Sequence, residues 1–325
     1  WTIAGIGALA WLFALLTFED QAPQDRSAPW DWVVQILAGG GCAASFFGAS
    51  ELTTHRFMSL IVFFPLLGGL AMLVALLVYE YNADEPLIPV RQLTNTLPLG
   101  GVLVAMCAGA ASVAMVELAQ TALQTKASPT HAGMLFWPEF GAALATAALF
   151  GAVFRTRLIP LLAFGGLIML SAAAAVLSGV ASGPNALVTV GSGLVGLGVG
   201  ASVSPALFVA GFSLRSTQIQ RVFAVVELLR GAAAFMVAPL LLHLAKTTGG
   251  SPQVGTRTAI WVCLGIAAGG ALVSSYLFVL GRARLRRPRL QEWLDGDSPA
   301  LDSPPLAQGI RGEHALARAV GLERP

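Results

Sequence analysis

Long apolar stretches separated by short polar segments fill most of this 325-residue chain. A helix rises about 1.5 Å per residue and the hydrocarbon core of a bilayer is about 30 Å thick, so a run of about 20 apolar residues can cross it. The pattern predicts nine membrane-spanning helices, at residues 2–18, 32–50, 57–79, 97–122, 131–154, 158–181, 185–212, 222–245 and 258–281. The fold class that it indicates is an all-α integral membrane protein.

The composition agrees with this fold class. Hydrophobic residues make up 56% of the chain, charged residues only 11%, and the mean hydropathy is +0.74. A net charge of +2 is too small to indicate binding to nucleic acid. All three cysteines fall inside predicted spans without disulfide or metal-ligand spacing, so we expect no metal site and no cofactor. Arginine greatly outnumbers lysine, as is common in proteins of GC-rich bacteria.

The distribution of Lys and Arg predicts the orientation in the membrane. With a cytoplasmic C-terminus, eleven arginines face inside: Arg26, Arg91, Arg155, Arg157, Arg215, Arg221, Arg282, Arg284, Arg286, Arg287 and Arg289. Four basic residues then face outside: Arg56, Lys126, Lys246 and Arg257. Because basic residues near span ends stay in the cytoplasm, we expect an inner-membrane protein with a cytoplasmic C-terminus. The odd span count then places Trp1 outside, and we expect the chain to be the C-terminal portion of a longer protein.

The same pattern divides the chain into four regions. Residues 1–18 hold one span, 19–96 form a linker region with two spans, 97–281 hold six spans, and 282–325 form a tail. The tail is basic at its start and then rich in Pro, Ser, Asp and Gly, a composition typical of disorder. We expect its arginines to anchor the last span at the lipid headgroups, in preference to binding anionic lipids specifically.

Four short motifs resemble those of a known family. They are EPLIPVR at 85–91, after two spans of which the first opens with Asp31-Trp32, AGMLFWP at 132–138, GLGVG at 196–200 and RGAAA at 230–234. In order and spacing the chain resembles the fourteen-helix drug/proton antiporter branch of the major facilitator superfamily. The resemblance implies that 1–18 is the last helix of an N-terminal half, 19–96 carries the two linker helices, and 97–281 is the C-terminal six-helix bundle.

The chain also departs from the family pattern. The loop GAVFRTR at 151–157 keeps the Gly and the basic residues of the family's charged loop but lacks its Asp. The family's Gly-Asp-Arg-Gly loop and Gly-Pro pair would lie in the sequence that precedes this chain. The resemblance implies proton-coupled export of amphipathic drugs or metabolites, with protons, the small substrate, membrane lipid and the N-terminal half as partners.

Four ionisable residues lie well inside the predicted spans: Glu117, Glu139, Glu227 and Arg230. Each costs about 2.5–3.5 kcal/mol at the membrane centre and therefore needs a partner or a wet cavity. None lies in the spans 158–181 and 258–281, which are peripheral in the resembled fold. Their distribution predicts a central aqueous cavity.

Glu117 and Glu139 are the candidate proton-coupling residues. A carboxyl group that loses hydration holds its proton more readily, so it can load and release a proton near neutral pH. The alternative is that both carboxylates line a water-filled vestibule without titrating.

The candidate substrate-binding residues surround these two carboxylates. Gln120 and Gln124 follow Glu117 at helical spacing and give one polar face. Met134, Phe136, Trp137 and Phe140 surround Glu139, and such a wall suits a hydrophobic cation. Aromatic side chains near a span end are, alternatively, residues of the interfacial belt.

Two further groups are candidates for movement. Glu227 and Arg230 are three residues apart, which favours a local structural ion pair over a gate that exchanges partners. Gly196, Gly198, Gly200 and Pro205 form a candidate hinge, although packing alone is the favoured explanation of the glycine run.

The sequence carries none of the motifs of hydrolytic or nucleotide-dependent enzymes, and we do not expect an enzyme. It has no Gly-x-x-x-x-Gly-Lys loop, no Gly-x-Ser-x-Gly and no His-Glu-x-x-His. One alternative is a membrane enzyme or channel subunit of another fold, although the paired Asp or His residues usual at the membrane face of intramembrane enzymes are absent from the sequence. The other is a membrane scaffold or non-transporting subunit, and a scaffold would need no carboxylates inside its spans.

Overall fold

The computed structural model describes residues 2–17, 31–84, 86–124, 128–248, 250–296 and 298–306. These residues form helices and connecting segments, with a single isolated β-bridge between Asn95 and Pro305 and no strand among them. Eight helices in these ranges are long and apolar enough to cross a membrane. The chain is therefore a multi-pass helical membrane protein, as its hydrophobic pattern predicts.

The first predicted span is shorter than the others. Helix α1 (Thr2–Thr17) has 16 residues, which at 1.5 Å per residue reach about 24 Å. Its large side chains are mostly not buried against the rest of the protein, and Trp11 and Phe13 are 66% and 64% exposed. The sequence predicted nine spans. The described residues contain eight helices long enough to span a membrane and one shorter apolar helix.

Two helices of the linker region form a hairpin. Its first span runs through α2 (Trp32–Gln35), a π-helical turn η1 (Ile36–Gly40) and α3 (Gly41–Glu51), and its second is α4 (Leu60–Asn82). Asp31 caps the first span by accepting a hydrogen bond from the backbone N–H of Val33 at 2.9 Å. A β-carbon on Gly48 would lie 2.8 Å from the carbonyl oxygen of Val62, so small residues allow these helices to touch closely.

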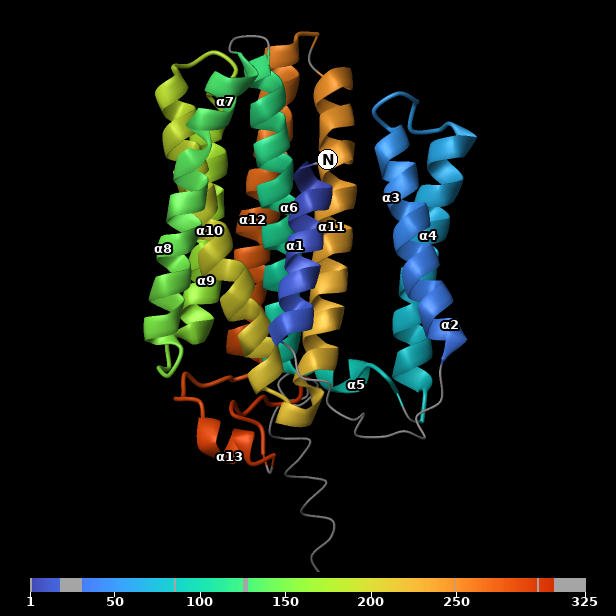
Figure 1. Ribbon diagram of the computed structural model, residues 1–325, viewed down its shortest axis with the longest axis vertical. Coiled ribbons are helices and arrows are strands. Elements are labelled where there is room, and N and C mark those ends of the chain that lie inside the picture. The colour runs from blue at the N-terminus through green and yellow to red at the C-terminus, as the bar shows by residue number, and fades with distance from the viewer. Residues whose placement is uncertain are drawn as a thin grey trace, which may run out of the picture.

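This hairpin stands beside helix α11 (Ile219–Thr247), as Figure 1 shows. The rings of Phe46 and Phe235 pack edge to face, with centroids 5.6 Å apart. Near the end of the hairpin, Lys246 Nζ donates to the carbonyl of Thr53 at 3.3 Å, and His243 Nδ1 lies 3.1 Å from the carbonyl of Leu52. The basic side chains of α11 thus meet the carbonyl groups at the end of α3, where the helix dipole favours positive charge.

The remaining spans form a six-helix bundle. They are α6 (Thr96–Gln124), α8 (Trp137–Val153), α9 (Ile159–Leu177), α10 (Asn185–Phe212), α11 and α12 (Pro252–Leu280). Four short elements connect or extend them: α5 (Val90–Leu93), α7 (Pro129–Leu135), the 3-10 turn η2 (Ser216–Gln218) and α13 (Leu290–Leu294). Helix α6 has the most buried span, because it packs against α10, α11 and α12 together.

Several of the helix contacts follow an inverted repeat, whereas the contacts α6–α9, α10–α11 and α11–α12 have no comparable counterpart among the described residues. The triplet α6, α8, α9 corresponds in order to the triplet α10, α11, α12. Under this correspondence the contact α6–α11 matches α10–α8, and the contact α6–α12 matches α10–α9. The contacts α6–α10 and α9–α12 map onto themselves. Figure 1 shows that α6 and α10 run in opposite directions, so the two triplets have opposite orientations across the bundle. Inverted three-helix repeats of this kind are frequent in secondary transporters.

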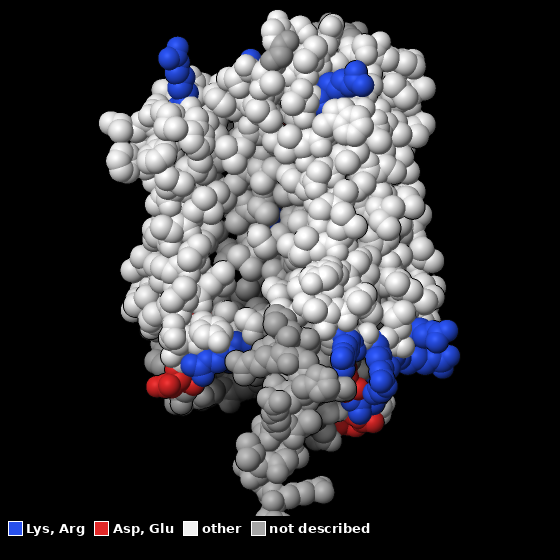
Figure 2. Space-filling model, turned by 180° about the vertical axis from the view of Figure 1, so that it is seen from behind, with Lys and Arg blue, Asp and Glu red and all other residues white. Residues whose placement is uncertain are grey.

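Basic residues gather at one end of the bundle, which we call the α13 end, and the opposite end we call the α7 end (Figure 1). The arginines at the α8–α9 turn, at the start of α11 and after α12 all lie at the α13 end. Figure 2 shows the blue side chains concentrated there and sparse at the α7 end. This asymmetry is the one on which the predicted orientation depends.

Part of the predicted tail is folded against the α13 end. We call residues 282–306, of which 297 is not described, the C-terminal strap. The indole Nε1 of Trp293 donates to the carbonyl of Leu214 at 2.8 Å, and Trp293 is only 7% exposed. The backbone N–H of Leu301 donates to the carbonyl of Phe212 at 2.9 Å. The strap therefore satisfies carbonyl groups at the end of α10 that the helix itself leaves open.

The strap also closes the start of α6. The backbone N–H of Thr96 and its Oγ1 both donate to the carbonyl of Pro304, the latter at 2.8 Å, and the N–H of Leu97 donates to Ser303 Oγ at 3.0 Å. This order up to residue 306 differs from the disorder predicted for the tail. Residues 307–325 lie outside the described residues.

Candidate functional site

Glu117 lies on an open face of α6. It is seven residues from Gln124, where α6 ends at the α7 end of the bundle, about 10 Å at helical rise, and its side chain is partly exposed. Gln120 and Gln124 are exposed and lie on the same face, as their spacing predicts. No described basic residue forms an ion pair with Glu117.

Glu139 lies just after a break between two helices. Pro138 has no N–H to donate, and the N–H of Glu139 bonds to the carbonyl of Phe136 at 3.0 Å, in a tighter turn than an α-helix makes. The carbonyl of Leu135 is consequently open, and Ser192 Oγ from α10 donates to it at 3.0 Å. Glu139 is thereby held in the first turn of α8, where the helix dipole favours a negative charge.

Helix α10 contacts this break directly. A β-carbon on Gly196 would overlap the backbone carbonyl of Glu139, and one on Gly200 would overlap Thr146 Oγ1 further along α8. On another side of α10, a β-carbon on Gly198 would lie 2.6 Å from Leu170 of α9. These three glycines thus serve close helix packing, the alternative left open beside the hinge.

Pro205, the last member of the candidate hinge, lies buried inside the continuous helix α10. A proline in a helix interior removes one backbone hydrogen bond and favours bending there. The hinge role of Gly196, Gly198, Gly200 and Pro205 stays a prediction.

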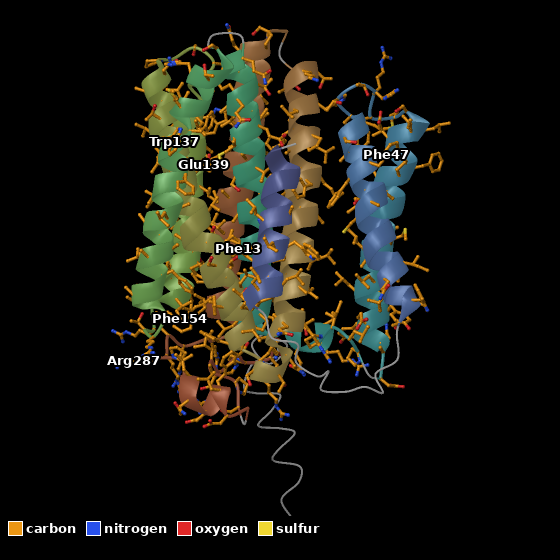
Figure 3. All side chains as sticks on the ribbon, viewed as in Figure 1. Phe13, Phe47, Trp137, Glu139, Phe154 and Arg287 are labelled. Carbon is orange, nitrogen blue, oxygen red and sulfur yellow. The ribbon has the colours of Figure 1, made fainter. Side chains whose placement is uncertain are left out.

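The four apolar residues near Glu139 do not form one wall. Met134, Trp137 and Phe140 are 66%, 70% and 67% exposed, whereas Phe136 is partly buried and packs against the bundle core. Figure 3 labels Trp137 and Glu139 near the α7 end of the bundle. Three of the four side chains are therefore exposed on the outside of the bundle, and Phe136 belongs to its packed interior.

Glu227 and Arg230 form the predicted ion pair within α11. Arg230 Nε donates to Glu227 Oε2 at 2.8 Å, and the two side chains are 30% and 39% exposed for Arg230 and Glu227 respectively. The aliphatic stem of Arg230 lies over Gly109 of α6, where a β-carbon would be 2.8 Å from its Cγ. The geometry therefore matches the structural interpretation of this pair, with α6 as the surface against which it packs.

The four ionisable residues share one property, which is partial exposure inside the spans. A charged group facing lipid tails is costly, so such a face requires water or another part of a protein against it. The arrangement can hold protons on two carboxylates and can bind a cation next to them. Helices α6 and α8, which carry these carboxylates, both pack against α10.

Three further residues position these helices although none of them belongs to a recognisable motif. Gly109 and Ser192 are ordinary small residues in apolar segments, and only the packing reveals what they contact. Glu80, near the end of α4, is 1% exposed and accepts a hydrogen bond from the N–H of Ile88 at 2.9 Å. Its position before a proline-containing loop was the available signal that it orders the linker.

No family model matches the chain, and no curated protein matches it.

Proposed function

We propose that this protein is a secondary active transporter of the major facilitator type, which exports amphipathic drugs or metabolites in exchange for protons. The observation that carries the proposal is the pair of carboxylates Glu117 and Glu139, both partly exposed inside membrane spans and both without an ion-pair partner among the described residues. Carboxylates in such positions are rare unless they serve a pathway for ions or substrate.

The architecture supports this proposal. The opposite orientation of the two helix triplets and their matching contacts are features of transporters that alternate between two openings. Such a bundle works against a second one, with the substrate between them. The open face that carries Glu117, Gln120 and Glu227 is where we place this second bundle, the N-terminal half of the transporter.

The proposed coupling is competition for one carboxylate. When Glu117 is ionised, it attracts a cationic substrate; when a proton arrives from outside, the acid becomes neutral and the substrate leaves. The exposed amide groups of Gln120 and Gln124 continue this polar face to the outer end of α6 and give a hydrated route for the proton.

The break before α8 supports a second role at Glu139. Substrate sites in secondary transporters often lie at discontinuous helices, because an interrupted helix presents backbone groups and its dipole to the ligand. Glu139 lies in the first turn after such a break, and Trp137 and Phe140 beside it are exposed. We assign to this region the contact with the apolar part of a cationic substrate.

The orientation that belongs to this proposal places the α13 end in the cytoplasm, in an inner membrane. Both carboxylates then lie nearer the outer surface. This placement suits a carrier that receives protons from outside and releases substrate there.

The experiment that tests the function is transport by the native protein in sealed phospholipid vesicles. An imposed pH gradient should drive accumulation of a lipophilic cation such as tetraphenylphosphonium, and a protonophore should abolish it. The alternative is a membrane scaffold or non-transporting subunit. It would be favoured if vesicles with the protein accumulated this cation and neutral amphipathic dyes no more than protein-free vesicles do.

A further inference from the structure

The C-terminal strap and the α8–α9 turn enclose two neighbouring cavities at the α13 end. The first, about 540 Å³, is lined by Thr156, Arg157, Leu158, Leu285 and Arg287. The second, about 430 Å³, is lined by Phe154, Arg155, Pro288, Leu290, Gln291, Trp293 and Leu294. Successive residues of the same two segments line the two cavities, and we refer to both together as the strap groove.

The arginines of the strap and of the α8–α9 turn include two sets that differ in their partners. Arg286 donates to Asp302 at 3.0 Å, and Arg289 donates to Asp302 at 2.7 Å and lies 3.3 Å from Glu292. These acid-paired arginines hold the strap together. Arg155, Arg157 and Arg287 form no ion pair with a described acidic residue, and they line the strap groove. Three positive charges therefore meet at the groove without neutralisation by the described acids.

The strap groove is also apolar. Leu158 and Leu294, which line it, are 44% and 67% exposed, and Leu161 on the next turn of α9 is 47% exposed. Figure 3 labels Arg287 at the lower edge of the bundle, near Phe154 and below the α8–α9 turn. Arginine side chains thus lie where the apolar surface of α8 and α9 ends, and arginines at the end of a membrane span commonly reach the lipid headgroups.

We infer that the strap groove binds the phosphate headgroup of an anionic phospholipid, with the acyl chains lying along the exposed surface of α8 and α9. Arginine suits a phosphate group because its planar guanidinium donates two parallel hydrogen bonds to it. The leucines beside the arginines favour a lipid over a free phosphate ion, since a free ion gains nothing from apolar contact.

Bound lipid would also join the strap to the α8–α9 turn. The strap already closes the ends of α6 and α10 through Trp293, Leu301 and Ser303. A lipid phosphate shared between Arg157 and Arg287 adds a third connection, to the helices α8 and α9. Anionic lipid should therefore stabilise the α13 end as well as bind to it.

The test is retention of lipid by the native protein in mild detergent, followed by native mass spectrometry. Dioleoylphosphatidylglycerol should bind at one saturable site more tightly than dioleoylphosphatidylcholine. The double variant Arg157→Gln, Arg287→Gln should weaken phosphatidylglycerol binding about fivefold for each arginine removed. The matched control Arg215→Gln, Arg221→Gln removes two exposed arginines at the same end, outside the groove, and should leave binding within about twofold.

Two results would overturn the inference. An equal loss in both double variants would mean that general surface charge attracts the lipid. Displacement of phosphatidylglycerol by equimolar inorganic phosphate would identify a site for a soluble anion. If the glutamine variant proves unstable, the double variant Arg157→Lys, Arg287→Lys is tested in its place. It keeps both positive charges, so it should still bind phosphatidylglycerol more tightly than phosphatidylcholine. Loss of that preference in folded protein would contradict a lipid site.

Discussion

Gly196 of α10 lies so close to Glu139 of α8 that a β-carbon on the glycine would overlap the backbone carbonyl of the glutamate. This contact lies at the helix break before Glu139, a carboxylate without an ion-pair partner among the described residues. The site therefore depends on a residue with no side chain, and the contact between the two helices is a direct test of the packing.

Gly196→Ala should destabilise the protein by about 1–3 kcal/mol, because the added methyl group forces α8 and α10 apart. The matched control is Gly193→Ala on the same helix, where the new β-carbon would lie 3.6 Å from Pro138, an ordinary contact distance. The measurement is the midpoint of thermal unfolding in detergent. Similar midpoints for the two variants would show that α8 and α10 are not in close contact at Glu139.

Arg230 and Glu227 should behave as a coupled pair. Arg230→Ala leaves the carboxylate of Glu227 without its partner and removes the stem that covers Gly109, so it should reduce stability and transport. The double variant Glu227→Gln, Arg230→Ala should recover part of this loss, with a coupling energy of about 0.5–3 kcal/mol. If the losses of the two single variants simply add in the double variant, the pair is not coupled.

The C-terminal strap should contribute measurably to stability through Trp293. Trp293→Ala removes a buried ring and the hydrogen bond to the carbonyl of Leu214, with an expected cost of about 3–5 kcal/mol. Leu294→Ala changes the adjacent, 67% exposed residue and should be nearly neutral. The measurement is the rate of backbone amide hydrogen exchange at residues 282–306. Equally fast exchange in the wild type and in Trp293→Ala would mean that the strap does not stay bound to the helix ends when the protein is in a membrane.

The proposed orientation can be tested with single cysteines in a variant that lacks Cys42, Cys107 and Cys263. Gln253, exposed at the α7 end of α12, and Gln220, exposed at the α13 end of α11, are suitable positions. In intact cells a membrane-impermeant maleimide should label Gln253→Cys and leave Gln220→Cys unlabelled until the cells are opened. The reverse pattern would place the α13 end outside and contradict the charge argument.

The hydrophobic pattern predicted the helical membrane fold because the bilayer requires long apolar helices of nearly fixed length. It did not predict the strap, because residues 282–306 fold through single hydrogen bonds from Trp293, Leu301 and Ser303 to distant helix ends. Those partners are about 80 to 200 residues away along the chain, and no local periodicity reveals them.

The candidate site was predicted in part for a similar reason. Helical spacing places Glu117, Gln120 and Gln124 on one face, and proximity along one helix pairs Glu227 with Arg230. The surroundings of Glu139 depend on how α10 packs against α8, so the partly buried position of Phe136 could not be deduced from its neighbours in the sequence.

The central claim, that Glu117 couples proton movement to transport, is tested most directly by one substitution. Glu117→Gln keeps the shape of the side chain but cannot release a proton. The variant, reconstituted into sealed vesicles in the same way as the wild-type protein, should remain folded. It should no longer accumulate tetraphenylphosphonium when a pH gradient is imposed. Glu51→Gln, at the last residue of α3, should accumulate the cation like the wild type. Undiminished accumulation by Glu117→Gln, with the wild-type dependence on pH, would contradict the account and leave Glu117 as a carboxylate that only lines a vestibule.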